Sequence, residues 1–155
     1  MIRYEHTQRG TVVQVALVIG ALVCFGLSQF LSAPPFVVPM VVAVFVICAY
    51  MFSSLTVQIT DRELHWCFGP GMFRKELDLA EIVSVEVTRT RLLEGWGIHK
   101  TSRGWLYNVS GFGAVLLTLH GGKRILLGTD EPDRLRLAIL QGIGPKERLL
   151  KKAQD

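Results

Sequence analysis

The sequence predicts an α+β membrane protein, in which a hairpin of two transmembrane helices precedes a small curled β-sheet or barrel of seven strands covered by a C-terminal α-helix. Three observations predict this fold. Residues 10–60 contain no Asp, Glu, Lys or Arg. From Ser54 onwards, apolar and polar residues alternate as in half-buried strands. Near the C-terminus, residues 131–143 show the apolar spacing of one helix face.

The uncharged stretch divides into two apolar segments, residues 11–32 and 36–53, joined by a turn at 33–35. Each segment approaches the roughly 20 residues that a helix needs to cross a bilayer core. Pro34 and Pro35 end the first helix and suit the first turn of the second. A signal peptide would have a shorter apolar region, and a soluble core hairpin would need polar faces that these segments lack. We therefore expect both segments to span a membrane.

The distribution of Lys and Arg predicts the orientation of this hairpin. Arg3 and Arg9 precede the first apolar segment, fifteen of the seventeen basic residues follow the second, and the connecting turn carries none. We therefore expect the N-terminal segment 1–10 and the whole chain after residue 53 to lie on the cytoplasmic side.

The first apolar segment carries small residues four positions apart. Residues at this spacing share one helix face, along which a second helix can approach closely. Packing within the hairpin and packing against another copy of the chain both satisfy the pattern, so a homo-oligomer is an open expectation. The residues are Ala16, Gly20, Cys24 and Ser28.

Seven segments after the hairpin read as strands. They alternate in polarity or are short apolar runs, and turn signals such as Gly69-Pro70-Gly71 and Gly121-Gly122 separate them. The two adjacent glycines suit the positive φ angles of a tight hairpin. The predicted strands are 54–60, 63–68, 73–79, 83–91, 105–109, 114–120 and 123–128.

A helix is predicted after the last strand. Thr129 or Asp130 can cap it, and the acidic residues that follow suit a helix N-terminus. The helix covers residues 131–143 and closes a β-domain that spans 54–143. A basic tail at 144–155 follows.

Part of the β-domain resembles a known family. The string "GWGIHKTSRGWLYNVSGFGAVLLTLHGGKRILLGTDEP" is similar to bacterial membrane proteins with a pleckstrin-homology-like (PH-like) domain, at Gly95–Ile98, Tyr107–Gly111 and Gly128–Pro132. The segments "LTVQITDREL" and "LDLAEIVSVEV" also resemble the opening strands of such domains, so that the resemblance covers roughly residues 50–142.

The resemblance implies a PH-like fold in the cytoplasmic (inner) membrane of a bacterium, often with a preceding helix pair, and implies no reaction. Domains of this kind are known to assemble. One departure concerns phosphoinositide-binding PH domains, which place clustered Lys and Arg in the first hairpin loop. Here that loop, residues 60–63, is nearly neutral.

Connectivity suggests a membrane-contact surface. If the first four strands run up and down, the turn after the second strand and the end of the fourth share the sheet end at which the second apolar segment enters. Trp favours the membrane interface, and Lys or Arg near an anionic leaflet contributes about 1 kcal/mol each. The alternative is that the glycines form turns, the Trp side chains fill the domain and the basic side chains are solvated. The candidate residues are Met72, Phe73, Arg74, Lys75, Arg89, Arg91, Trp96, Lys100, Arg103 and Trp105.

Catalytic, cofactor and metal sites are not predicted. His65 and Cys67 share a strand face without a third ligand at useful spacing, the acids at 130–133 suit a helix start, and no phosphate-binding loop occurs. Cys24, Cys48 and Cys67 have no disulfide or metal spacing. Basic and aromatic residues could stack bases, but the net charge of +4 is low and tethering near a bilayer leaves little room for nucleic acid.

The sequence therefore predicts a non-catalytic scaffold or interaction protein without a cofactor. Its expected partners are membrane lipids with anionic headgroups, or membrane proteins. The alternative is an accessory or regulatory subunit that binds a soluble protein or peptide through the β-domain, for example by adding a strand to a sheet edge.

Overall fold

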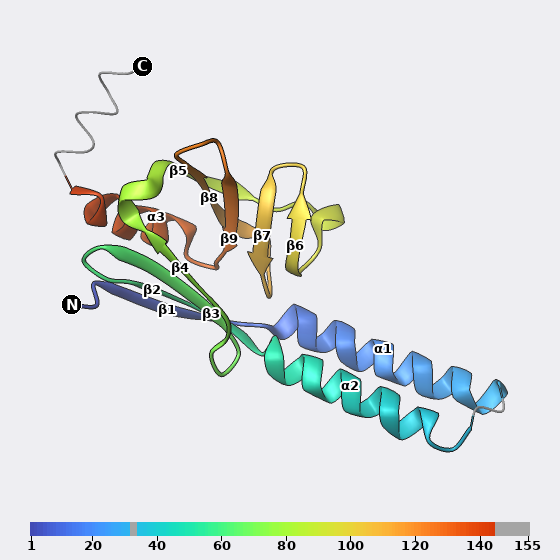
Figure 1. The fold of residues 1–155 in the computed structure, drawn as a ribbon. Helices are drawn as coiled ribbons and strands as arrows, with labels where there is room; N and C mark the ends of the chain where they lie inside the picture. Colours follow the sequence, from blue (N-terminus) through green and yellow to red (C-terminus); the bar gives the residue numbers. More distant parts are fainter. Residues whose placement is uncertain (32–33, 145–155) are drawn as a thin grey trace.

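The structure is a computed structural model that describes residues 1–31 and 34–144. It has the predicted α+β composition, with an N-terminal helix pair, a β-domain and a C-terminal helix (Figure 1). The predicted tail lies outside the described residues from Pro145 onwards. The elements are β1 (Tyr4–Arg9), α1 (Thr11–Phe30), α2 (Val37–Met51), β2 (Ser54–Ile59), β3 (Glu63–Phe68), β4 (Met72–Asp78), the 3-10 helix η1 (Leu79–Glu81), β5 (Ile82–Arg89), the 3-10 helix η2 (Leu92–Glu94), β6 (Gly97–Thr101), β7 (Gly104–Asn108), β8 (Gly113–Leu119), β9 (Arg124–Gly128) and α3 (Pro132–Gly142).

The N-terminal segment 1–10, predicted as a separate region, belongs to the β-domain. It forms β1, which pairs antiparallel with β2 so that Arg9 lies opposite Ser54. The two helices are therefore inserted between neighbouring strands of one sheet, and Figure 1 shows them extending away from the domain together. The sequence of β1, YEHTQR, is too polar to read as a half-buried strand; only Gln8 is buried.

The helix pair is apolar and uncovered. α1 has 20 residues and is long and apolar enough to cross a membrane, whereas α2 has 15 and is shorter than the predicted segment 36–53. Neither helix has a buried residue. Of the four small residues, Gly20 faces α2: a Cβ there would lie 2.8 Å from the ring of Phe45. Ala16 and Cys24 are exposed and Ser28 is half-buried.

The described residues form nine strands in two sheets, whereas seven strands were predicted. The first sheet has the antiparallel order β1-β2-β3-β4, and the second has the order β5-β8-β9-β7-β6 with β7 and β9 parallel. The prediction of four up-and-down strands is wrong for the fourth, because β5 pairs with β8 in the second sheet. The chain changes sheets at η1, where Asp78 accepts a hydrogen bond from the Ala80 amide. Besides β1, the other strand that was not predicted is β6, which lies in the segment predicted as a loop and pairs with β7.

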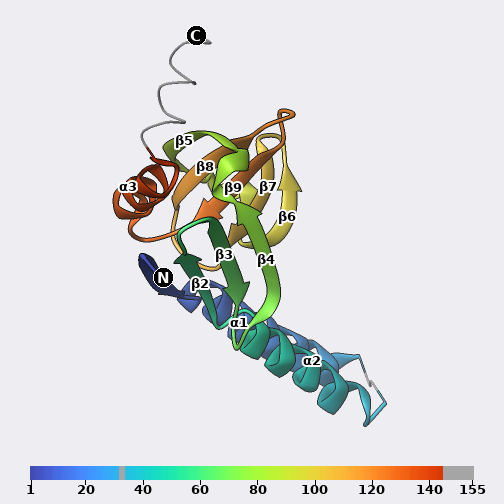
Figure 2. The same ribbon diagram turned by 60° about the vertical axis from the view of Figure 1, so that its left-hand side comes forward.

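The core lies between the two sheets, and α3 closes one side of it. Figure 2 shows α3 and β6 on opposite sides of the domain. α3 packs against β5, β8 and β2. The buried core residues are Leu55, Val57, Ile59, Leu64, Trp66, Phe68, Leu77 and Leu79 from the first sheet and η1, Ile82, Val85, Tyr107, Val109, Val115, Leu117, Leu119, Ile125 and Leu127 from the second, and Leu135, Ile139 and Ile143 from the C-terminal helix and its cap.

Candidate functional site

Most of the predicted contact residues lie on the side of the β-domain where α1 begins and α2 ends. We term this region the helix-end surface and define it as residues 68–74, 89–97 and 110–112. It is built from three segments of the β-domain: residues 68–74 contact the helix pair, residues 110–112 contact β1, and residues 89–97 contact residues 110–112.

Phe52 connects the helix pair to the first sheet. Its ring makes an edge contact with Phe68 at a centroid distance of 5.5 Å and stacks on Phe73 at 5.9 Å. Phe73 has φ = 48°, and it is the one non-glycine residue with positive φ in the described part of the chain. This conformation costs about 1–2 kcal/mol for an L-residue. The residue with this strained backbone is therefore the one whose ring stacks on Phe52. Despite the stacking, Phe73 is 47% exposed.

Two glycines allow the helix ends to touch the sheet directly. The Gly10 amide donates to the Ser53 carbonyl at 2.8 Å, and a Cβ on Gly10 would lie 2.2 Å from the Phe52 carbonyl oxygen. Gly69 has φ = 49°, and a Cβ there would lie 2.7 Å from the carbonyl oxygens of Tyr50 and Met51. Backbone therefore meets backbone at both positions, which fixes the direction in which the helices leave the domain.

The second sheet reaches the same region through two loops. Gln8, two residues before Gly10, donates from Nε2 to the Ser110 carbonyl at 2.9 Å. Trp96 donates from Nε1 to the Gly111 carbonyl at 3.0 Å, and its ring lies 5.8 Å from that of Phe112. The segment around η2 is thus held against the loop that contacts β1, and Trp96 is half-buried in this contact.

Arg103 has a structural role. Its Nε donates to Glu94 Oε1 at 2.9 Å, and its other nitrogens donate to Thr88 Oγ1 at 3.1 Å and to the Arg89 carbonyl at 3.0 Å. β5 and β6 are the opposite edges of the second sheet. These bonds bring the two edges together, so the sheet is strongly curved. The hydrogen bond from Arg103 is the main cause that lowers the pKa of Glu94. Arg103 is therefore committed to an ion pair.

The other predicted residues are distributed over both sheets. Met72 and Phe73 are half-exposed in the helix-end surface, and Arg74, Arg89 and Arg91 are exposed there. Lys100 and Trp105 lie outside it as register partners on β6 and β7, and Trp105 is 40% exposed. Lys75 lines a hollow between the two sheets, which is described below.

Two residues that sequence reasoning missed are among the most exposed apolar side chains of the β-domain. Leu92 is 68% and Leu93 99% exposed, both on η2. Segment 83–91 was read as one strand that ends at Arg91, so the leucines after it received no role. The sequence feature that could have indicated them is the pair of adjacent leucines itself, which lies between a run of alternating residues and Gly95.

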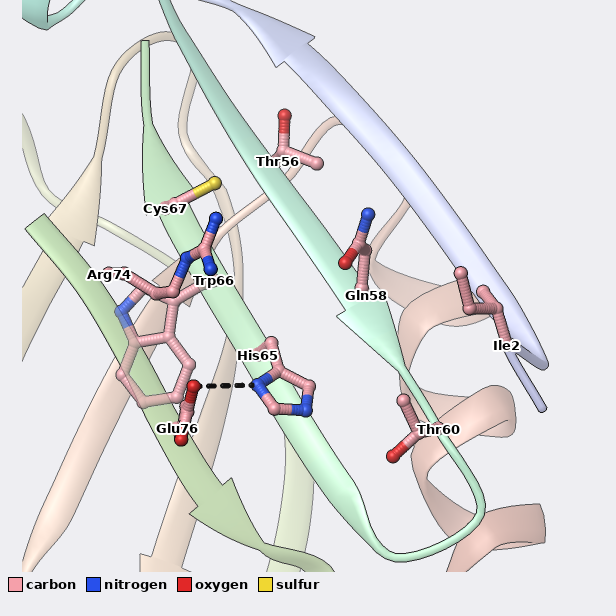
Figure 3. Close-up of a pocket in the computed structure, with 9 residues that line it drawn as sticks. All are labelled: Ile2, Thr56, Gln58, Thr60, His65, Trp66, Cys67, Arg74 and Glu76. Atoms are coloured by element: carbon pink, nitrogen blue, oxygen red, sulfur yellow. Dashed lines mark ion pairs between the residues drawn. The ribbon is translucent and has the colours of Figure 1, made fainter. Parts of the chain in front are cut away.

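The outer face of the first sheet carries a polar hollow of about 280 Å³ (Figure 3). His65 lies in it between two carboxylates, with Nε2 3.1 Å from Glu63 Oε2 and Nδ1 3.6 Å from Glu76 Oε1. Figure 3 shows the Arg74 side chain lying over β3 beside Cys67. His65 and Cys67 share this face as predicted, but among the described residues no group of three His, Cys, Asp or Glu side chains could hold a metal ion.

A second hollow of about 280 Å³ lies between the sheets beside β4. The rings of Trp66 and Tyr107 meet in it edge to face at 5.3 Å. Trp66 is 3% exposed, and its Nε1 has no hydrogen-bond partner in the described part of the chain. Burial raises the pKa of Tyr107. Charged side chains of both signs surround the opening: Lys75, Glu76, Asp78, Glu81 and Lys123.

Comparison of the chain with protein-family models, with curated proteins and with solved structures found no match. No relative therefore assigns a role to the residues of the helix-end surface or of the two hollows.

Proposed function

We propose that this protein is a non-catalytic, membrane-anchored interaction module whose helix-end surface lies on the bilayer and contacts lipid headgroups. The observation that carries the proposal is the rigid join between the helices and the sheet at Phe52, Gly10 and Gly69. Because this join fixes the helix direction, insertion of the helices turns the helix-end surface towards the membrane plane.

The geometry of the helix pair supports insertion as a hairpin. α1 is about 30 Å long at 1.5 Å per residue, which matches a bilayer core. The chain leaves and re-enters the domain at Gly10 and Ser53, which are hydrogen-bonded neighbours, so a hairpin keeps both flanks on one side. The excess of Lys and Arg in the flanks favours the cytoplasmic side. The resemblance to PH-like membrane proteins agrees with a bacterial inner membrane.

The composition of the helix-end surface supports lipid contact. Met72 and Phe73 are half-exposed, and Arg74, Arg89 and Arg91 are exposed. Apolar and aromatic side chains suit the interfacial region, and cations suit anionic headgroups. The one acidic side chain of the surface, Glu94, is neutralised by Arg103.

Lipid retention tests the proposal on the full chain. Native mass spectrometry from detergent micelles would compare retained phosphatidylglycerol with retained phosphatidylcholine. We expect preferential retention of the anionic lipid, and a several-fold loss of it in the double variant Arg89→Gln, Arg91→Gln. Lys123→Gln, on the β8–β9 turn, is the matched control and should retain lipid like the native chain. Equal retention of both lipids by the native chain would contradict the proposal.

A second candidate function is an accessory subunit that binds an extended peptide at β4. β4 is the last strand of its sheet, and its outer edge has no backbone partner among the described residues. The second hollow, which lies beside β4, contains the unpartnered Trp66 N–H. A photo-crosslinker at Lys75 in intact membranes tests this, with Glu5 on the opposite edge strand as the matched position. Protein adducts confined to Lys75 favour the peptide site, whereas their absence removes it.

A further inference from the structure

We infer that η2 is a membrane-inserting loop, in which Leu92 and Leu93 enter the bilayer and Arg89 and Arg91 contact phosphate groups at its surface. The inference rests on the proposed function, because the membrane hairpin sets the orientation. It adds a specific contact that the anchor alone does not require.

The exposure of the two leucines is the first argument. Leu93 is 99% exposed and Leu92 68%, while Leu137, on α3, is 53% exposed. Burial of a leucine side chain is favourable, and two adjacent leucines exposed on a short turn form an apolar patch of the kind that marks a contact surface. No described residue covers Leu93.

The position of η2 is the second argument. The Thr90 amide donates to the Phe112 carbonyl at 2.8 Å, and Trp96 bonds to Gly111. The adjacent residue Ser110 accepts from Gln8, next to the start of α1. Figures 1 and 2 both show β6, which follows η2, on the side of the domain towards which the helix pair extends, with α3 on the far side. η2 therefore lies on the side that faces the bilayer.

The loop is also preformed. The Glu94 amide donates to the Arg91 carbonyl at 2.9 Å, the Arg91 amide donates to Glu94 Oε2 at 2.7 Å, and Gly95 donates to Leu92 at 3.2 Å. Arg103 holds the Glu94 carboxylate from the other side. The leucines are thus presented without an ordering step, and insertion brings no unpaired carboxylate to the headgroups.

The flanking residues favour a bilayer over a protein surface as the occupant. Arg89 and Arg91 are exposed on the N-terminal side of the leucines, and half-buried Trp96 follows them. From its surface inwards, a membrane presents phosphate groups, then the interfacial region and then acyl chains. Cations, an indole and leucines suit these three layers in that order.

The test uses the full chain in nanodiscs of phosphatidylcholine and phosphatidylglycerol. In a variant with Cys24, Cys48 and Cys67 replaced, Leu93→Cys carries an environment-sensitive fluorophore, and Leu137→Cys is the matched control on an exposed leucine. We expect blue-shifted emission and several-fold stronger quenching by lipids with nitroxide-labelled chains at position 93 than at 137. Both leucines are exposed, so neither substitution threatens folding.

Other outcomes overturn the inference in distinguishable ways. Equal, water-like emission at 93 and 137 would show that η2 does not enter the bilayer. Blue-shifted emission at 93 without quenching by lipid would show that a protein surface, including a second copy of this chain, covers the leucines. A third label at Met72 separates the two proposals: lipid quenching at 72 but not at 93 leaves the proposed function standing, and its absence at both positions removes both.

Discussion

Phe73 of β4 stacks on Phe52 at the end of α2, with ring centroids 5.9 Å apart and planes inclined by 24°. One ring belongs to the β-domain and the other to the helix pair, so the contact unites two parts that the sequence presents as separate segments. Since Phe52 also contacts Phe68 in the core, the end of α2 packs directly onto the first sheet. Under the proposed function, a domain anchored in this way presents one fixed face to the membrane.

Loss of the Phe52 ring should loosen this connection. Phe52→Ala removes both ring contacts, and we expect it to lower the free energy of unfolding by about 2–3 kcal/mol, because Phe52 is only partly buried. The distance between spin labels at Leu27 and Leu137, measured by electron paramagnetic resonance, should also show a broader distribution. Phe112→Ala, which removes a ring contact with Trp96 away from the join, is the control. An unchanged distribution would contradict a rigid join.

Gly69 should tolerate no side chain. Gly69→Ala adds a Cβ 2.7 Å from two carbonyl oxygens of α2, at a positive φ. Gly121→Ala meets open space at φ = 85°, so it reports the backbone strain alone. We expect about 1 kcal/mol of destabilisation for Gly121→Ala and roughly 2 kcal/mol more for Gly69→Ala, measured by thermal unfolding in the same lipid. Equal losses would mean that the turn moves away from α2 without cost.

The ion pair between Glu94 and Arg103 predicts an acid-sensitive loop. The folded pKa of Glu94 lies below its ordinary value of 4.5. The pair therefore stabilises the fold above the ordinary pKa and loses this contribution as the pH falls through the lowered folded pKa. We expect Arg103→Met to cost at most about 1 kcal/mol at neutral pH, since the pair is partly exposed, and less once the pH falls through the lowered pKa of Glu94. Urea unfolding of both chains as a function of pH measures this, and a pH-independent difference would refute it.

The helix pair should be replaceable by a tight turn. Arg9 and Ser54 are register partners, so an Asn-Gly turn in place of residues 10–53 closes an ordinary hairpin between β1 and β2. We expect a folded β-domain with dispersed amide signals in nuclear magnetic resonance spectra. A chain that begins at Ser54 lacks β1, leaves the edge of β2 open and should be clearly less stable. Equal stability of the two chains would show that β1 contributes nothing.

The sequence predicted the parts of this fold that follow from local patterns. An uncharged stretch from Gly10 to Thr60 gave the helix pair, and alternation gave β2 and β3 close to their observed bounds. β1 was missed because its pairing with β2 bridges 44 residues of helix pair and loops, and its own residues are polar. β6 was missed because it is a short edge strand that begins with glycine.

The candidate site depended more on tertiary structure. Arg103 reads as a free cation in the sequence, and only the curve of the second sheet brings it to Glu94 and the end of β5. Leu92 and Leu93 read as ordinary apolar residues, because exposure follows from the way η2 projects from the domain. In contrast, Met72 and Phe73 were placed correctly at the end of the sheet where α2 enters, since a single hairpin turn separates them from β3.

The most direct measurement of the central claim is the membrane depth of the helix-end surface in the full chain. Nitroxide labels at Met72 and, as a reference, at Lys123 would be compared in lipid nanodiscs for accessibility to oxygen, which partitions into the bilayer, and to a water-soluble nickel chelate. If the helix-end surface lies on the bilayer, position 72 collides more with oxygen and position 123 more with nickel. If both labels are equally open to the nickel chelate, the domain stands away from the membrane and the proposed function is wrong.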